Sequence, residues 1–194
     1  MRKSNLCALA LIPLCCTVAE GKEYRGPKCL GPFCIGDYGP GTRMFQQLGP
    51  PSQRLDMYCY EFQRTKAFLR VEMENVGSNQ RIVAEVNLSD FSTCMHVPKG
   101  LNQITADDLC TWRTPEGVGL GSTEEDVIRA YGKPDYERQL DSKTYHLAVP
   151  GYRKTDSPPP VGGKMLVYKG REDESRCTWF GIRNGRVAWI NLSQ

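Results

Sequence analysis

Cysteine is the residue type in this sequence best suited to chemistry, with nine copies among 194 residues beside only two histidines. Thiols pair as disulfides in exported proteins or hold metals such as zinc. Cys29 and Cys34 are spaced more widely than the usual zinc-binding pair, and no second close pair follows them. We therefore expect disulfides, and we predict no metal site and no cofactor.

The two histidines, His96 and His146, limit nucleophilic catalysis, because a serine or cysteine nucleophile needs a base of this kind. Neither lies in a recognisable nucleophile motif; His96 falls in an expected linker and His146 in an expected strand. The acidic run Glu124-Glu125-Asp126 is better explained by a helix dipole than by acid-base work. We expect no catalytic residues, and hence that the chain is not an enzyme.

The first nineteen residues have the pattern of an export signal. Two basic residues precede a short apolar run at 6–14, and small residues precede a cleavage point after Ala19. The run is too short to cross a bilayer, and no later stretch is apolar enough. Residues 1–19 are thus predicted to be a signal peptide, and the mature chain to be periplasmic or secreted. A lipid anchor at Cys15 or Cys16 is the alternative, which the leucine before Cys15 disfavours.

Removal of this segment leaves six cysteines, an even number typical of disulfide-bonded exported proteins. They are Cys29, Cys34, Cys59, Cys94, Cys110 and Cys177. Six cysteines allow 15 pairings, so the sequence does not fix the connectivity. We prefer Cys110 with Cys177, because this bond would tie the entry of the second half of the chain to its own sheet.

The charge of the mature chain is close to balance. Loss of Arg2 and Lys3 leaves 25 − 2 = 23 basic residues against 22 acidic ones, a net charge of +1. Binding to nucleic acid by bulk electrostatics needs a marked basic excess. We therefore expect no nucleic-acid partner.

The chain contains an internal repeat. Ile82–Ser89 aligns with Arg186–Ser193, and five of the eight positions are identical. Upstream in each copy, a turn that begins with glycine and contains proline recurs at residues 49–52 and 132–135. The repeat predicts that one structural module occurs twice.

A short helix is expected to open each module. In the second copy, Ser122 and Glu125 match a capping box, and Val127, Ile128 and Tyr131 fall on one face. In the first copy, a weaker apolar stripe consists of Met44, Phe45 and Leu48.

Strands are expected to follow each helix. The predicted ranges are 57–62, 67–73 and 81–88 in the first copy, and 165–168, 177–182 and 186–192 in the second. Asn184-Gly185 is the clearest hairpin turn, because it accepts the positive φ angles that tight hairpins need. The second copy adds a strand at 144–149 and a loop at 150–163, rich in proline and glycine, which we expect to be either an exposed connector or a tip that faces a partner.

These patterns predict an α+β fold of two tandem modules, each a short helix packed on a three- to four-stranded antiparallel sheet. The expected organisation is a signal peptide at 1–19, an N-terminal segment at 20–30, module 1 at 31–93, a linker at 94–116 and module 2 at 117–194.

The string Gly119-Leu120-Gly121-Ser122-Thr123-Glu124-Glu125-Asp126-Val127, then Tyr131-Gly132-Lys133-Pro134-Asp135, Tyr168 and Gly185-Arg186-Val187, resembles the BamE-like (SmpA/OmlA) family of bacterial envelope proteins. Tandem copies of the module also resemble the β-lactamase inhibitor protein. The resemblance implies a helix followed by a three-stranded sheet, but it carries over no functional residue. The outer-membrane assembly protein of that family is a single-module lipoprotein. This chain departs from it because it has two modules, six cysteines after residue 19 and no good lipoprotein signal.

Function is expected to be the binding of another protein, of unidentified kind, in the bacterial envelope. Exposed aromatic and arginine side chains would anchor such an interface, with Trp112, Tyr152, Arg153 and Trp189 as candidates. For Trp189, which replaces Glu85 at the equivalent strand position, a place in the core is the alternative. The alternative is a secreted inhibitor of a hydrolase, which predicts that the two sheets form one continuous concave surface. An unrecognised enzyme is the third reading, and it would need a cleft lined by groups with perturbed ionisation.

Overall fold

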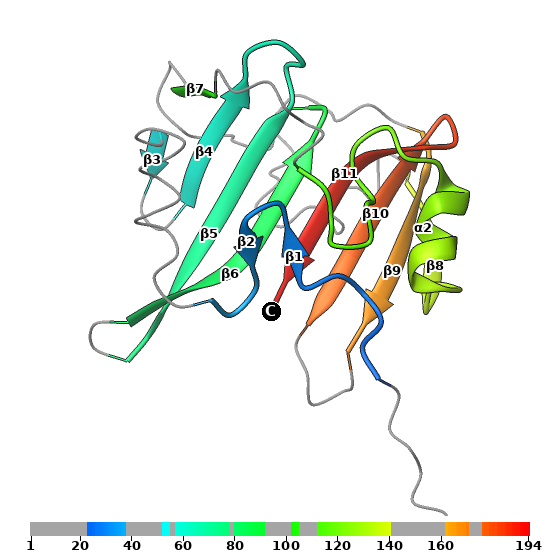
Figure 1. The fold of residues 1–194 in the computed structure, drawn as a ribbon, viewed down its shortest axis with the longest axis horizontal. Helices are drawn as coiled ribbons and strands as arrows, with labels where there is room; N and C mark the ends of the chain where they lie inside the picture. The colour runs from blue at the N-terminus through cyan, green and yellow to red at the C-terminus, as the bar shows by residue number, and fades with distance from the viewer. Residues whose placement is uncertain are drawn as a thin grey trace, which may run out of the picture.

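The computed structural model describes residues 23–37, 52–54, 57–77, 80–91, 102–104, 112–140, 162–170 and 176–194. Most of these residues form strands (Figure 1). The strands are β1 (Cys29–Leu30), β2 (Phe33–Cys34), β3 (Ser52–Arg54), β4 (Met57–Phe62), β5 (Phe68–Val76), β6 (Gln80–Ser89), β7 (Asn102–Ile104), β8 (Tyr136–Gln139), β9 (Lys164–Lys169), β10 (Cys177–Arg183) and β11 (Arg186–Ser193).

One large sheet dominates the described part of the chain. Its strand order is β3-β4-β5-β6-β11-β10-β9-β8, and β7 pairs in parallel with β4 as the ninth strand. The other neighbours along this path are antiparallel. A separate two-stranded sheet is formed by β1 and β2.

The predicted α+β fold of two separate helix-on-sheet modules is wrong. The described residues contain one short helix, α2 (Glu124–Tyr131), and the strands of both copies join into a single sheet, so the fold is nearly all β. The sequence predicted the longer strands but not that the last strand of one copy, β6, would pair with the last strand of the other, β11. The helix expected around Met44, Phe45 and Leu48 and the strand expected at 144–149 lie outside the described residues.

Six strands lie close to the ranges predicted from the sequence. The six predicted ranges correspond to β4, β5, β6, β9, β10 and β11, with ends that differ by at most three residues. Asn184 and Gly185 take φ angles of 51° and 72°, as the predicted tight hairpin requires. The sequence missed the short strands β1, β2, β3, β7 and β8. Of these, β3 and β8 each begin at or just after the last residue of the repeated glycine-proline turn.

The two copies meet where β6 pairs with β11, a boundary that we call the seam. These strands carry the repeated sequence, and Asn87 lies directly opposite Asn191, its own equivalent in the other copy. The residue pairs on either side of this one are therefore also related by the repeat, because exchanging the two copies turns one of these pairs into the other. Each copy contributes its four strands to the path in the same order from the outer edge to the seam, so the halves are related by an approximate two-fold rotation.

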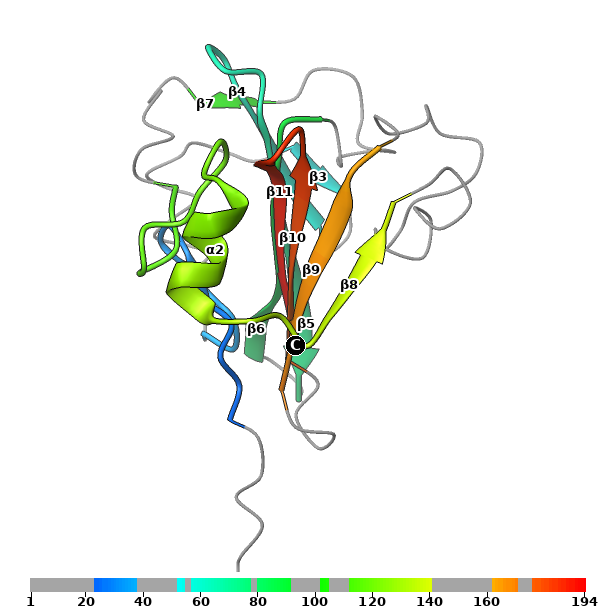
Figure 2. The ribbon, with the colours of Figure 1, turned by 90° about the vertical axis from the view of Figure 1, so that its right-hand side faces the viewer.

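One face of the sheet carries the main apolar core. Leu69, Leu88, Ile190, Phe180 and Leu166 form an unbroken row across β5, β6, β11, β10 and β9, and all five are fully buried. Figure 2 shows α2 and the blue β1–β2 segment on this same side of the sheet. Because the row crosses the seam, both copies share one hydrophobic core.

α2 lies over the second copy's half of this face. Val127 and Tyr131 are buried, and Tyr131 stacks on Phe180 at a centroid distance of 5.4 Å. Ile128 is 38% exposed, so its predicted place in the buried stripe is wrong. No helix among the described residues is both long and apolar enough to cross a membrane.

The cap of α2 lies one residue later than predicted. Thr123 is the N-cap: its Oγ1 accepts from the Asp126 amide at 3.2 Å, and the Thr123 amide donates to Asp126 Oδ2 at 2.9 Å. Ser122 instead accepts a hydrogen bond from the Gly119 amide at 3.0 Å. The predicted Ser122–Glu125 box is therefore replaced by a Thr123–Asp126 box with the same reciprocal geometry.

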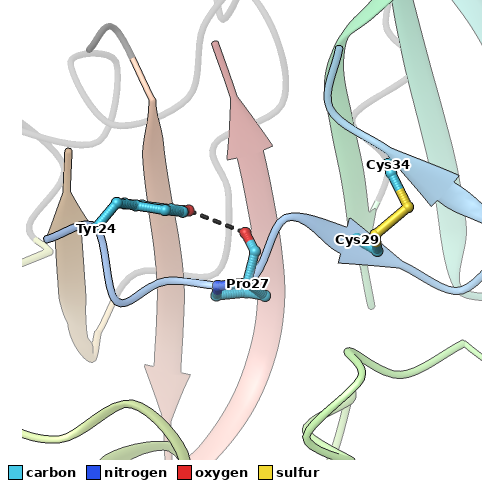
Figure 3. The surroundings of a disulfide bond; sticks show 4 residues. All are labelled: Tyr24, Pro27, Cys29 and Cys34. Carbon is cyan, nitrogen blue, oxygen red and sulfur yellow. Dashed lines mark hydrogen bonds between the residues drawn. A yellow bond between two sulfur atoms is a disulfide. The ribbon is translucent and has the colours of Figure 1, made fainter. Parts of the chain in front are cut away.

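Cys29 and Cys34 form a disulfide that closes the β1–β2 hairpin, with Cα atoms 4.0 Å apart (Figure 3). Just before it, the Tyr24 hydroxyl donates to the Pro27 carbonyl at 2.9 Å. Cys59 is also disulfide-bonded, whereas Cys177 carries a free thiol. The preferred bond between Cys110 and Cys177 is therefore not formed.

Thr123→Ala is expected to lower the free energy of unfolding by about 1 kcal/mol, because it removes one half of the capping box. Thr123→Ser keeps the hydroxyl and is expected to lose much less. Urea unfolding of the two variants measures the difference. A larger loss for Ser122→Ala than for Thr123→Ala would contradict the observed cap.

Candidate functional site

The second face of the sheet, opposite α2, differs in character between the two copies. On the first copy it carries Arg70, Glu72 and Glu85; at the equivalent places of the second copy it carries Trp179, Gly181 and Trp189. The second copy's side chains belong to a small apolar cluster with Met165 and Val167. The repeat has therefore diverged into a polar half and an apolar half.

The polar half contains a buried ion pair. Arg70 is 3% exposed and Glu85 is 7% exposed, and Arg70 Nη2 donates to Glu85 Oε1. Arg70 Nε lies 3.4 Å from Glu72 Oε1. Burial raises the pKa of Glu85 above its ordinary value, although the Arg70 charge acts in the opposite direction.

Asn191 connects this ion pair to the seam. Its Nδ2 donates to Glu85 Oε1 at 2.6 Å, from the other copy. Its Oδ1 is buried and has no hydrogen-bond partner among the described residues. We call Arg70, Glu85 and Asn191 the seam cluster. Neither of the two clefts described below includes a residue of the seam cluster, so this cluster suits a structural role.

A cleft of about 390 Å³ opens at one end of the seam, and we call it the seam cleft. Its apolar lining comes from Ala67 of the first copy and from Leu120, Val187 and Ala188 of the second. Its polar lining comes from Thr65 and Asp90 of the first copy and from the β10–β11 hairpin with Arg183 and Arg186. Neither copy alone could form it.

Two arginines dominate the charge of the seam cleft. Arg183 and Arg186 are direct cross-strand partners at the end of the β10–β11 hairpin. Arg183 Nη2 is paired with the Asp90 carboxylate, whereas Arg186 Nη1 donates to the neutral Gly121 carbonyl at 2.8 Å. Partial burial raises the pKa of Asp90, and the Arg183 charge opposes this shift. The lining thus carries one cation more than it has anions.

A second cleft, of about 380 Å³, lies beside the start of α2. Its described lining balances two arginines, Arg113 and Arg129, with two carboxylates, Glu116 and Asp126. Arg129 pairs with Asp126 at 3.0 Å. Glu116 Oε2 lies 2.5 Å from the Tyr131 hydroxyl. This cleft therefore lacks the excess charge of the seam cleft and is the weaker candidate for a site.

The aromatic anchors expected from the sequence are not on the described surface. Trp112 is 4% exposed and packs edge-on against Phe62, with ring centroids 5.5 Å apart. Trp189 is 3% exposed, and its ring fills the space where Gly181 lacks a side chain, 2.1 Å from an ideal Cβ. Both tryptophans are core residues, which is the alternative that the sequence left open for Trp189.

Several predicted site residues lie outside the described part of the chain. They are Tyr152, Arg153, Cys94 and Cys110. His96 and His146, for which no role was predicted, also lie outside it. Among the described residues, no group of three histidine, cysteine, aspartate or glutamate side chains is placed to hold a metal ion. The seam cleft was missed because its residues come from four separate stretches of sequence that only the seam brings together.

No protein-family model, curated protein or solved structure matches this chain. The resemblance to the BamE-like family stays a prediction. The geometry of the site is therefore the basis for assigning a function.

Glu85→Ala is expected to lower the free energy of unfolding by about 3–5 kcal/mol, because it leaves the Arg70 charge buried without its main partner. Glu72→Ala is the matched control: Glu72 is partly exposed, and its loss is expected to cost less than about 1 kcal/mol. A double variant, Arg70→Met with Glu85→Leu, should be more stable than Glu85→Ala alone. Equal losses for Glu85→Ala and Glu72→Ala in urea unfolding would contradict the role of the seam cluster.

The raised pKa of Glu85 also predicts a pH dependence. Between the ordinary value of 4.5 and the higher pKa in the folded state, the folded protein binds more protons at this site than the unfolded chain does. The free energy of unfolding contributed by Glu85 should therefore fall as pH rises through this window. Glu85→Gln removes the dependence, so urea unfolding of both proteins from pH 4 to 8 isolates it. A contribution that grows with pH would show that the pKa is lowered instead.

Proposed function

We propose that this chain is an exported, non-catalytic protein-binding module of the bacterial envelope. Export is supported by the signal-like segment at 1–19. The envelope assignment is supported by the resemblance of residues 119–135 and 185–187 to BamE-like proteins. The partner is another protein, because the balanced charge gives no basis for binding nucleic acid.

The seam cleft is the observation that carries this proposal. Its lining combines apolar side chains with charged ones, as protein-binding surfaces commonly do. Among its described lining residues Asp90 is the only carboxylate, and Asp90 is already paired with Arg183. Such a lining suits recognition better than acid-base chemistry, which needs a base within reach of a substrate proton.

A secreted inhibitor of a hydrolase is the second candidate. This reading required that the two sheets form one continuous concave surface, and the uninterrupted strand order across the seam supports the continuity. An inhibitor and an assembly module differ in what happens after binding. Enzyme inhibition therefore separates the two.

Affinity capture is the test of the proposed function. Mature protein, immobilised through its C-terminus, is expected to recover a discrete protein from a bacterial envelope extract. Arg138→Gln, which changes an exposed residue of β8 away from the seam cleft, should recover the same protein. Recovery of no protein above an unrelated exported control would contradict the proposal.

Inhibition assays distinguish the second candidate. An inhibitor should slow at least one enzyme in a panel of β-lactamases and cell-wall hydrolases, with a ratio of one inhibitor to one enzyme. Captured partners whose hydrolysis rates are unchanged by a tenfold molar excess of the protein would reject inhibition and leave binding in place.

A further inference from the structure

We propose that the seam cleft binds an acidic, partly apolar peptide segment of the partner protein, with Arg186 as the main contact for a carboxylate. The inference rests on the proposed protein-binding function and specifies the chemistry of the ligand. It follows from three features of the described residues: the opposed arginines, the uneven neutralisation of their charges and the apolar floor between the two copies.

Two arginines lie opposite each other at the end of the β10–β11 hairpin. Like charges directly opposite one another on neighbouring strands destabilise a sheet. Arg183 and Arg186 occupy such positions at the β10–β11 hairpin. Asp90 neutralises Arg183, but Arg186 makes no ion pair among the described residues and donates only to a backbone carbonyl. A bound carboxylate would therefore give Arg186 the counter-charge that Arg183 already has in Asp90.

The floor of the cleft decides which anion fits. Ala67, Leu120, Val187 and Ala188 line it with apolar side chains beside the two guanidinium groups. A free phosphate would use the arginines but make no apolar contact with this lining, of which Leu120 is the partly exposed member. A peptide that alternates acidic and aliphatic residues would use both, since guanidinium groups bind carboxylates in a forked geometry while aliphatic side chains cover the floor.

Asp90 competes with such a ligand. It holds the Arg183 guanidinium that a second carboxylate of the peptide would otherwise reach. Replacement of Asp90 by asparagine removes this competitor and raises the positive charge of the lining. The proposal thus predicts one variant that weakens binding and another that strengthens it, and general destabilisation of the fold cannot produce both.

The test is a titration followed by ¹H–¹⁵N NMR with a defined probe, acetyl-Glu-Leu-Asp-Leu-Glu-amide. Its neutral twin, acetyl-Gln-Leu-Asn-Leu-Gln-amide, and inorganic phosphate serve as separate arms. The acidic peptide should shift the amide signals of Ala67, Asp90 and residues 183–188. Arg186→Gln should weaken its binding about tenfold, the size expected for one charge-assisted hydrogen bond. Asp90→Asn should strengthen it several-fold, and Arg138→Gln should leave it unchanged.

Three results would overturn the inference: no shifts in these amides with the acidic peptide, equal binding of the neutral twin, or a preference for phosphate over the peptide. Thermal unfolding of each variant checks that the fold is kept. Affinity capture separates this inference from the proposed function. If wild type and Arg186→Gln recover the same protein equally well, protein binding stands and the acidic-peptide site is rejected.

Discussion

The pairing of β6 with β11 is the constraint on which the structure depends. The duplicated sequence meets itself there, with Asn87 opposite Asn191, so the two halves of the sheet are joined by the strand that each copy would otherwise expose as an edge. An open antiparallel edge invites association with other chains. Pairing within one chain closes both edges at once, lets one apolar row run across the seam from β5 to β9 and creates the cleft at the end of the seam.

The seam cluster also helps to set the register in which β6 and β11 pair. A shift by one residue would move the apolar side chains of β11 to the opposite face and carry Asn191 away from Glu85. A buried ion pair contributes little net stability, since the loss of hydration offsets much of the attraction. Its clearer effect is to disfavour alternative registers, because these would leave the Arg70 and Glu85 charges buried without their partners.

Local structure was largely predictable from the sequence, whereas the assembly of the elements was not. Alternating apolar residues and the Asn184-Gly185 turn identified most of β9–β11, because those signals act over a few residues. The single sheet depends on contacts between segments about a hundred residues apart, and so does the cleft. Trp189 illustrates the limit: its burial depends on the missing side chain of Gly181 on the neighbouring strand, which no local pattern around either residue reveals.

Native-state hydrogen exchange is the most direct test of the central claim, that pairing at the seam makes the two copies one cooperative unit. Amides of β6 and β11 should exchange only through global unfolding, with the same free energy of opening in both strands as urea unfolding gives for the whole protein. The account would be contradicted if the amides of one copy exchanged at a distinctly lower free energy while those of the other copy stayed protected, since the halves would then unfold separately.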